Sequence, residues 1–327
     1  MNIVFATSDL YSRLAAVTLQ SLLENNQDAE SIQIYYIHHD ISAENEEMLQ
    51  TLVDRYDRNI IFLPMPLKLC NIPSIGLKDP IVYSYCYLQD ILPDTVDKVL
   101  LIESDTIVMG RLQPLYDTKL GDCYAAATDD MQSGIFKKRL KMKTDSVYIN
   151  SGVMLLNLRK CREQHLSDKM DKMLANGKHE LFYEVQDELN IIFEGKIVVL
   201  PPTYNATTSL FLFDYKNMLR YRKPSTKCSR KEFDEAVSKP IIVHFTTNRI
   251  IQPRPWIVGC THPFTSEYMR FKQESPSADM QLWPEKQKPT GQVARFLYMR
   301  VSKRLVASVV GFLHAILHPL FLYKYLK

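Results

Sequence analysis

Short apolar runs alternate with amphipathic stretches through the N-terminal third of the chain. Apolar runs bounded by polar residues predict buried strands, and apolar positions three and four residues apart predict helices. Strands are expected at Asn2–Ala6, Ile32–Ile37, Asn59–Leu63 and Lys98–Ile102, and helices at Leu14–Glu24, Ala43–Tyr56 and Tyr83–Leu92. This alternation predicts a parallel sheet that is covered by helices on both faces.

The pattern is less regular in the middle of the chain. Further strands are expected at Asp122–Thr128, Val147–Leu156 and Pro240–Phe245, and further helices at Leu166–Ala175 and Glu184–Phe193. Residues 203–239 and 273–290 are polar, contain several prolines and are expected to be irregular. We therefore predict an α/β domain over residues 1–272, a linker over residues 273–290 and a helical tail over residues 291–327.

Two acids, Glu103 and Asp105, flank Ser104 directly after the apolar run Lys98–Ile102. Ligands of open α/β sheets bind beyond the carboxyl ends of the strands. Two carboxylates at such a place can bind a hard divalent cation, which can neutralise a diphosphate. This is the chemistry of enzymes that use nucleotide-activated sugars. The alternative is an ordinary acidic turn after a core strand, because short motifs recur by chance.

Glycine and cysteine usage excludes several other kinds of site. The 10 glycines form neither a GxGxxG motif nor a GxxxxGK motif, so the chain has no dinucleotide fingerprint and no P-loop. The 6 cysteines are scattered without a CxxC pair, which argues against a disulfide framework and a zinc–thiolate site. The first residues lack the basic and apolar regions of a signal peptide. We therefore expect a reduced, cytoplasmic protein.

Five ordered blocks of the sequence resemble glycosyltransferase family 8, which includes lipopolysaccharide galactosyltransferases and glycogenin-like enzymes. The blocks are residues 2–11 (NIVFATSDLY), 96–105 (VDKVLLIESD), 150–157 (NSGVMLLN), 186–190 (QDELN), and 243–245 (VHF) with 254–256 (RPW). The resemblance spans residues 1–272. It implies a single nucleotide-sugar-binding domain of the GT-A type, Rossmann-like with a mostly parallel central sheet. It also implies a retaining transferase that uses a UDP-sugar.

The resemblance implies a metal site formed by Glu103, Asp105 and His244. Their oxygen and nitrogen ligands suit Mn²⁺ better than Mg²⁺, although either ion is compatible. The ion would bridge the donor diphosphate and stabilise the leaving UDP. Arg254 can hydrogen-bond phosphate oxygens through its planar guanidinium. The alternatives are a structural histidine at the end of a strand and a surface arginine.

The first block implies a nucleotide site after the first strand, formed by Ala6, Thr7, Ser8, Asp9 and Tyr11. Backbone groups and short polar side chains there can bind the uracil edge, and an aromatic ring suits stacking on a base. The alternative is that Ser8 or Asp9 caps the helix that starts near Tyr11.

Ser104, which lies between the two acids, is also assigned to the nucleotide site. Three further residues are assigned to the sugar by resemblance: Asp130 as a sugar-contacting acid, and Asn150 and Gln186 near the anomeric carbon. A neutral amide at Gln186 is a poor nucleophile compared with a carboxylate, which favours same-face internal return over a covalent intermediate. The alternative for Gln186 and Asp187 is a polar pair at a helix N-terminus, where the dipole favours an acid.

The chain departs from the family pattern at three positions. Glu103 stands where the family has Asp, Tyr85 stands where the family usually has Arg, and Val185 stands where the family has an acid.

The expected function is metal-dependent transfer of a hexose from a UDP-sugar to a glycan or lipid-linked acceptor in cell-surface polysaccharide synthesis. The alternative is a catalytically impaired UDP-sugar-binding or scaffolding protein. A nucleotidyltransferase is disfavoured because the first 75 residues contain no glycine for a phosphate loop.

Charge is unevenly divided between the tail and the rest. Residues 291–327 hold six of the 40 basic residues and none of the 37 acids, so residues 1–290 carry 34 basic and 37 acidic groups. This balance argues against a nucleic-acid-binding face on the body.

The tail also contains an apolar segment, residues 305–322, with basic residues before it and Tyr323, Lys324 and Tyr325 after it. A spanning helix needs roughly 20 apolar residues, and such flanks suit a helix that lies on anionic lipid. We therefore expect residues 291–327 to attach the protein peripherally to the inner face of the cell membrane and to be dispensable for folding. The alternative is a helix that packs on the body or on a second subunit.

Overall fold

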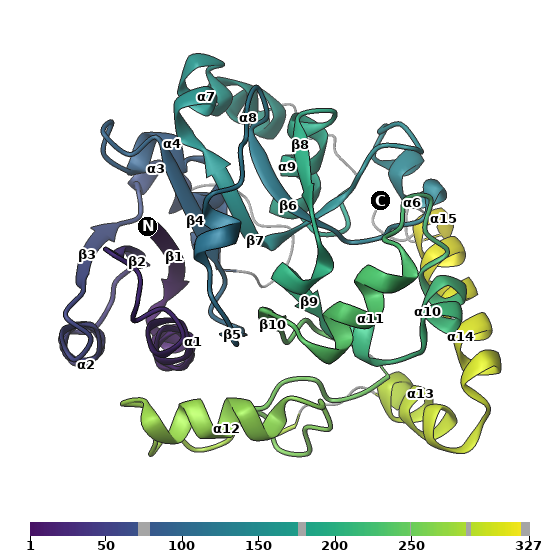
Figure 1. Ribbon diagram of the computed structural model, residues 1–327. Coiled ribbons are helices and arrows are strands. Elements are labelled where there is room, and N and C mark those ends of the chain that lie inside the picture. Colours follow the sequence, from purple (N-terminus) through teal and green to yellow (C-terminus); the bar gives the residue numbers. More distant parts are fainter. Residues whose placement is uncertain (71–78, 176–180, 249, 286–288, 322–327) are drawn as a thin grey trace.

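A seven-stranded sheet in the order β3-β2-β1-β4-β7-β6-β8 forms the centre of the molecule (Figure 1). The structure, a computed structural model, describes residues 1–70, 79–175, 181–248, 250–285 and 289–321. The strands of this sheet are β1 (Asn2–Ser8), β2 (Gln33–His39), β3 (Asn59–Pro64), β4 (Lys98–Ile102), β6 (Ala125–Asp129), β7 (Ile149–Asn157) and β8 (Ile197–Leu200). Only β7 runs antiparallel to its neighbours, so the predicted mostly parallel α/β sheet is confirmed.

Helices cover both faces of the sheet, because successive strand residues point to opposite sides. Ile3 and Phe5 pack against α1 (Ser12–Glu24) and α2 (Ala43–Asp54). Val4 packs on the other face, where the covering elements are the 3-10 helix η2 (Pro80–Cys86), α3 (Leu67–Cys70), α4 (Leu88–Ile91), α7 (Leu158–Glu163), α8 (Leu166–Ala175) and α9 (Val185–Phe193). The short helices α5 (Gln113–Tyr116) and α6 (Gly134–Arg139) flank β6 in the sequence.

A second, three-stranded sheet lies beyond the end of β4 and was not predicted. It has the order β5-β10-β9, from β5 (Thr106–Val108), β10 (Ile242–His244) and β9 (Ala206–Thr207). Strand β5 follows β4 after a short turn, so this turn joins the two sheets. The carboxyl ends of β1 and β4 and the N-terminal end of β7 therefore face the small sheet (Figure 1).

The prediction that residues 203–239 are irregular was wrong. This segment contains η3 (Pro202–Asn205), η4 (Thr208–Phe211), α10 (Tyr215–Arg222) and α11 (Arg230–Ser238). Helix α11 starts with a full capping box between Ser229 and Glu232, which is a helix-start signal in the sequence. Only a narrow stripe of α10 and of α11 is apolar. The predominantly polar composition of residues 203–239 therefore gave no sign of these two helices.

The expected helix Tyr83–Leu92 is also different in the structure. The 3-10 helix η2 begins at Pro80, whose preceding residue Asp79 caps it by accepting a hydrogen bond from the Ile81 N–H. The short helix α4 follows after Tyr87. Proline in the first turn and an aspartate cap favour this earlier start.

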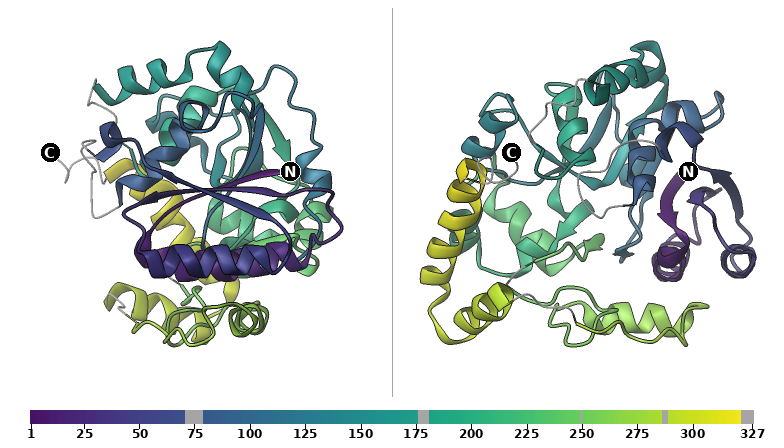
Figure 2. Two further views of the ribbon diagram at one scale, coloured as in Figure 1. Left: turned by 90° about the vertical axis from the view of Figure 1, so that its left-hand side faces the viewer. Right: turned by 180° about the vertical axis from the view of Figure 1, so that it is seen from behind.

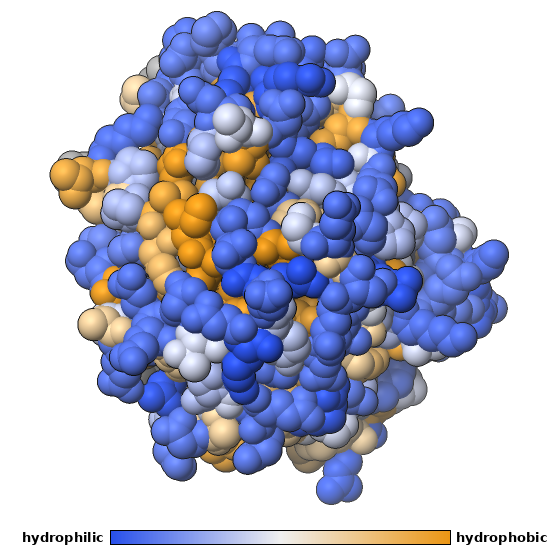
Figure 3. All heavy atoms as spheres, turned by 60° about the vertical axis from the view of Figure 1, so that its left-hand side comes forward, coloured by the Kyte–Doolittle hydropathy of each residue, from blue (hydrophilic) through white to orange (hydrophobic). Residues whose placement is uncertain are grey.

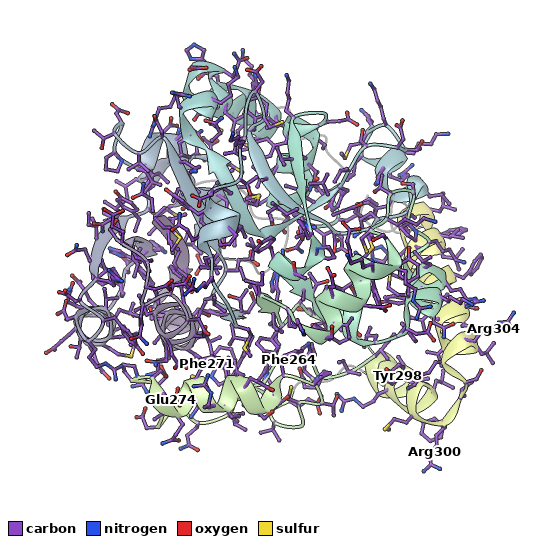
Figure 4. The ribbon with its side chains drawn as sticks, in the orientation of Figure 1. Phe264, Phe271, Glu274, Tyr298, Arg300 and Arg304 are labelled. Atoms are coloured by element: carbon purple, nitrogen blue, oxygen red, sulfur yellow. The ribbon has the colours of Figure 1, made fainter. Side chains whose placement is uncertain are left out.

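The predicted domain boundary at residue 272 falls inside α12 (Thr265–Glu274). This helix runs alongside α1, and Phe264 and Phe271 lie on the side that faces the body (Figure 2, Figure 4). The chain after it also contacts the body, since the Ser277 hydroxyl donates to the Arg13 carbonyl at 2.8 Å. Residues 286–288 of the proposed linker lie outside the described residues.

The tail packs on the body along one side. It consists of α13 (Pro289–Arg300) and a continuous helical run formed by α14 (Lys303–Phe312), the π-helical turn η5 (Leu313–Leu317) and α15 (His318–Phe321). These helices lie on the side of the molecule opposite α2 and β3 (Figure 1, Figure 2). Val306 and Ala307 are buried with Met218 and Tyr221 of α10. This packing favours the alternative of a helix that packs on the body, and the dispensability of the tail for folding stays a prediction. Residues 322–327 lie outside the described part of the chain.

The other side of the tail is apolar and exposed. Ten of the sixteen exposed large apolar residues in the described chain lie in α13–α15: Val293, Phe296, Leu297, Met299, Leu305, Val309, Phe312, Leu313, Leu320 and Phe321. By length and composition alone, the run Lys303–Phe321 could cross a membrane. The face shown in Figure 3 is mainly hydrophilic, with its apolar side chains in a central band. Exposed apolar residues are thus concentrated on the tail.

Gly311 allows α14 to approach α10 closely. A Cβ atom at this position would lie 2.6 Å from the Arg220 carbonyl oxygen and 2.7 Å from the Tyr221 Cα atom, both backbone atoms. Although alanine is the better helix former, we expect Gly311→Ala to lower the free energy of unfolding by about 1–3 kcal/mol through overpacking. Urea denaturation measures the change.

Gly134→Ala is the matched control for this experiment. Its added Cβ would make only ordinary contacts, 3.5 Å or more, with Thr144 and Ser225 side chains. We expect this variant to be as stable as the wild-type protein. A Gly311→Ala protein that unfolds at the wild-type urea concentration would show that the tail does not pack on α10.

Candidate metal centre and its hydrogen-bond network

The turn Glu103–Asp105 between β4 and β5 is held by backbone hydrogen bonds from several directions. The Glu103 N–H donates to the Gly152 carbonyl of β7 at 2.8 Å, and the Phe245 N–H donates to the Asp105 carbonyl at 2.9 Å. The Thr18 hydroxyl of α1 lies within hydrogen-bond distance of two carbonyl oxygens of this segment, that of Ser104 at 3.0 Å and that of Thr106 at 2.8 Å. The backbone of the turn that carries the two acids is therefore held by three separate elements of the fold.

His244 reaches this turn because β10 pairs antiparallel with β5, with His244 opposite Thr106. Its Nε2 atom lies 3.3 Å from a Glu103 carboxylate oxygen and 3.1 Å from an Asp105 carboxylate oxygen. One ligand atom from each of the three residues lies within 4.8 Å of the others. The structure thus brings together the three side chains predicted to bind a metal.

The electrostatics of this group are those of a positive ion between two carboxylates. Burial opposes a charge on His244, but Asp105 and Glu103 raise its pKa to about 10. Burial also opposes ionisation of Asp105, but His244 and Arg254 keep its pKa below the usual value. The arrangement favours a cation at this place, which in the absence of a metal is the proton on His244.

The residues present fit a divalent metal ion. A Cβ atom at Gly152 would lie 2.3 Å from the His244 ring and 2.6 Å from a Glu103 carboxylate oxygen, so only glycine leaves room for both side chains. Carboxylate oxygens together with an imidazole nitrogen suit Mn²⁺, and Mg²⁺ less well. When bound, such an ion would offset the negative charge of an anionic ligand.

Tyr85 lies at the same centre. The residue is only 6% exposed, and its hydroxyl is hydrogen-bonded to the Glu103 side chain. Burial, together with the nearby carboxylates of Glu103 and Asp105, raises the pKa of Tyr85 well above its usual value, so the hydroxyl stays a donor. Tyr85 and Glu103, two residues that depart from the family pattern, are therefore in direct contact with each other.

Gln186 is held in one position at the start of α9. Its Oε1 atom accepts hydrogen bonds from the Ser151 N–H at 3.1 Å and from the Asn150 side chain at 3.2 Å. Asn190 ties α9 to β7, because its side chain bonds both backbone groups of Ile149. Two of the residues assigned to the sugar, Asn150 and Gln186, are therefore in contact.

Asn205 connects these residues to the candidate metal centre and was missed in the sequence. One amide atom of Asn205 lies 3.0 Å from His244 Nδ1, and the other lies 2.9 Å from Asn150 Oδ1. Asn205 ends η3, in the segment expected to be irregular, and no motif marks it. Only the fold brings Asn205 between His244 and Asn150.

Asp130 forms a buried ion pair. One carboxylate oxygen lies 2.7 Å from Arg222 Nη2, and the other accepts a hydrogen bond from the Gln132 side chain at 2.8 Å. Its link to Gln186 is indirect, because the Asp130 N–H donates to the carbonyl of Tyr148 while Gln186 donates to the Tyr148 hydroxyl. Arg222 therefore neutralises the acid that the resemblance assigned to the sugar.

The residues assigned to the nucleotide lie at the same edge of the large sheet. Ala6, Thr7 and Ser8 end β1, which pairs with β4 just before the acidic turn. The Asp9 carboxylate accepts hydrogen bonds from the Ser42 N–H and the Asn45 side chain, so it supports the N-terminus of α2. Ser8 occupies the N-cap position of the 3-10 helix η1 (Asp9–Tyr11), but neither Ser8 nor Asp9 makes a side-chain capping hydrogen bond to this helix or to α1.

Two further assigned residues contact aromatic side chains of the C-terminal part. Tyr11 packs edge-on against Trp283, with ring centroids 5.6 Å apart. Arg254 Nη2 lies 3.5 Å from an Asp105 carboxylate oxygen, and its guanidinium lies 5.5 Å from the centre of the Trp256 ring. Arg254 thus places a positive charge beside the candidate metal centre.

Comparison with known proteins gives one consistent family. The profile of "Glycosyl transferase family 8" matches residues 2–256. General stress protein A of Bacillus subtilis (strain 168) is 25% identical over 278 residues, which are 83% of this chain and 92% of that protein. A lipopolysaccharide 1,2-glucosyltransferase of Escherichia coli is 27% identical over 229 residues, which are 68% of this chain and 67% of that protein.

Solved structures agree with the fold. The crystal structure of galactosyltransferase LgtC in complex with donor and acceptor sugar analogs superposes with a TM-score of 0.72 at 24% identity. The superposition covers 84% of this chain and 96% of that chain. At this identity the likeness shows the fold, and the expected GT-A-like architecture is confirmed.

Gly152→Ala tests the geometry of the metal centre. Because the new Cβ would overlap the His244 ring and the Glu103 carboxylate, we expect the ring to shift and the affinity for Mn²⁺ to fall at least about tenfold, as for other losses of ligand orientation. Calorimetric titration with Mn²⁺ measures the affinity, and circular dichroism verifies that the variant is folded.

Gly110→Ala serves as the control, because its new Cβ would lie 3.7 Å from the Ile241 side chain, an ordinary contact. It should bind Mn²⁺ like the wild-type protein. Equal Mn²⁺ affinities for the Gly152→Ala and Gly110→Ala proteins would contradict a metal site at Glu103, Asp105 and His244.

Proposed function

This chain belongs to glycosyltransferase family 8, and from this premise we propose that it transfers a hexose from a UDP-sugar to a saccharide or lipid-linked glycan acceptor. The observation that carries the proposal is the convergence of Glu103, Asp105 and His244. Such a group binds the ion that a nucleoside diphosphate needs as a counter-charge. The similarity to lipopolysaccharide glucosyltransferases supports a cell-surface glycan as the acceptor.

The metal would be held by Glu103, Asp105 and His244, and it would supply positive charge for the diphosphate of the leaving UDP. Arg254 is close enough to Asp105 to add a second charge to the same phosphate oxygens. Ala6, Thr7, Ser8, Asp9, Tyr11 and Ser104 are proposed to bind the uridine. Their position at the carboxyl ends of β1 and β4 supports this assignment.

Asn150, Gln186 and Asp130 are proposed to orient the transferred sugar. Gln186 carries a neutral amide whose oxygen already accepts two hydrogen bonds of 3.2 Å or less, so it is poorly suited to form a covalent bond with the sugar. Retention by same-face internal return fits this arrangement, because the acceptor then enters on the face from which the UDP phosphate departs. The division of the chain into residues 1–272, 273–290 and 291–327 stays a proposal, in which the second and third parts pack on the first.

Calorimetry with nucleotides and mass spectrometry of UDP-sugar turnover test this function. We expect UDP to bind in the presence of Mn²⁺ more tightly than ADP or GDP, and at least one UDP-hexose to be turned over. Asp105→Ala should abolish Mn²⁺-dependent binding because it removes a ligand carboxylate. Asp122→Ala changes an exposed acid and should be without effect.

Two results would change the proposal. Equal affinities for the three nucleoside diphosphates would refute the uridine assignment. Binding of UDP-sugars without turnover, with saccharide and lipid-linked acceptors alike, would favour the alternative of a binding or scaffolding protein.

Residues 291–327 are proposed to bind an anionic membrane surface. Arg300 and Arg304 point away from the body (Figure 4) and, with Lys303, are exposed beside the apolar residues of α13 and α14. Arg295 is paired with Glu285 at 2.7 Å and adds little net charge. Basic residues next to an exposed apolar helix face suit a helix that lies on lipid. This placement supports a peripheral protein on the cytoplasmic face of the membrane.

Packing favours lying on the membrane over crossing it. The backbone at Gly311 lies so close to that of Arg220 and Tyr221 that a Cβ atom would not fit between them, and the Ser133 hydroxyl donates to the Ala315 carbonyl at 2.7 Å. A helix that crossed the bilayer would carry these parts of the body into the hydrocarbon, where charged groups are costly.

Substitution of exposed residues tests the membrane proposal without disturbing the core. Phe296 and Phe312 are 58% and 46% exposed, and each buried aromatic side chain contributes roughly 1.5–3 kcal/mol. We expect Phe296→Ser combined with Phe312→Ser to lower partitioning onto anionic vesicles at least about tenfold. Co-sedimentation with the vesicles measures this partitioning. Leu282→Ser, which is 40% exposed outside the tail, is the control. Unchanged sedimentation of the double variant would refute attachment through the tail.

A further inference from the structure

We propose that Asn205 is a positioning residue whose two amide atoms perform separate tasks in the reaction. Its oxygen orients His244 for the metal, and its NH₂ group orients Asn150, which in turn holds Gln186. This inference rests on the proposed function, because it assigns Asn205 to the metal and to the sugar side of the same site.

A backbone donor fixes the direction of the first two hydrogen bonds. The Gly152 N–H donates to Asn150 Oδ1 at 3.0 Å, so this atom is an oxygen. The Asn205 atom 2.9 Å from it must then be the NH₂ nitrogen, which turns the Asn205 oxygen toward His244 Nδ1 at 3.0 Å. His244 therefore carries a proton on Nδ1 and presents Nε2 to Glu103 and to Asp105.

A second backbone donor fixes the direction on the sugar side. The Ser151 N–H donates to Gln186 Oε1, so the Asn150 NH₂ group also donates to this oxygen. The Gln186 NH₂ group then donates to the Tyr148 hydroxyl, which in turn donates to Asp187. In this chain of hydrogen bonds, each residue from His244 to Tyr148 donates to the next one, and Asp187 is the final acceptor. Reversing one bond would leave two donors or two acceptors facing each other.

Burial of the residues makes a reversal of these hydrogen bonds unfavourable. Asn205 and His244 are each 2% exposed and Asn150 is 8% exposed, so water cannot readily replace a lost partner. The backbone holds Asn205 in place, because β9, which begins at the next residue, pairs with β10 and sets Thr207 opposite His244. Asn205 can therefore affect the metal and the sugar side independently, through one atom each.

Asn205→Asp separates the two tasks because it keeps one atom and replaces the other. The carboxylate still accepts the bond from His244 Nδ1, but it has no hydrogen to donate to Asn150 Oδ1. We expect Mn²⁺ affinity to be equal to or higher than that of the wild-type protein, because a carboxylate makes the imidazole a stronger ligand. We expect kcat to fall about 10- to 100-fold, with a smaller change in the KM for the UDP-sugar.

Asn205→Ala removes both bonds, so Mn²⁺ affinity and kcat should fall together. Asn59→Asp adds the same charge at an exposed position on β3 and should leave both quantities unchanged. A crystal structure of the Asn205→Asp protein should show His244 in place, while Asn150 or Gln186 has moved. This last measurement does not depend on turnover.

The outcomes distinguish this inference from the proposed function. A wild-type protein without Mn²⁺-dependent turnover contradicts the function, and the crystal structure then decides the role of Asn205. Equal losses of Mn²⁺ affinity in the Asp and Ala variants, wild-type kcat in Asn205→Asp, or unmoved Asn150 and Gln186 in its structure would each overturn the inference.

Discussion

The rest of the site depends on the charge balance between two carboxylates and one imidazole, whose ligand atoms lie within 4.8 Å of one another. Glu103 and Asp105 would repel each other without a cation between them. The raised pKa of His244 favours a proton that provides this charge, and a divalent ion can take its place. The fold keeps the three side chains together by joining the two sheets at one turn and by leaving Gly152 without a side chain beneath them.

The hydrogen-bond network extends this constraint toward the sugar side. His244 can serve the metal only if its other nitrogen has an acceptor, and Asn205 provides it. The same amide continues to Asn150 and Gln186. The Tyr85 hydroxyl adds a hydrogen bond to the Glu103 side chain. The Glu103 side chain is thus in contact with a tyrosine of η2, and both residues depart from the family pattern.

Much of this arrangement was predictable from local sequence, and some of it was not. The apolar run before Glu103 marks the strand that ends at the metal centre, and ordered blocks identify His244 and Gln186. Asn205 and Arg222 carry no comparable signal. Both lie in residues 203–239, whose polar composition gave no sign of the helices α10 and α11. The tail shows the same limit. Its composition indicated an exposed apolar surface, but only the packing of Gly311 against α10 shows that one side belongs to the core.

The most direct measurement of the central claim is the anomalous scattering of Mn²⁺ in crystals of the full chain grown with UDP. We predict one strong peak within ligand distance of Glu103, Asp105 and His244 Nε2, with the diphosphate of UDP against it and Arg254 beside the phosphate oxygens. A Mn²⁺ peak at another place, or UDP bound beside the Glu103–Asp105 turn with no metal between its phosphates and the two carboxylates, would contradict the account.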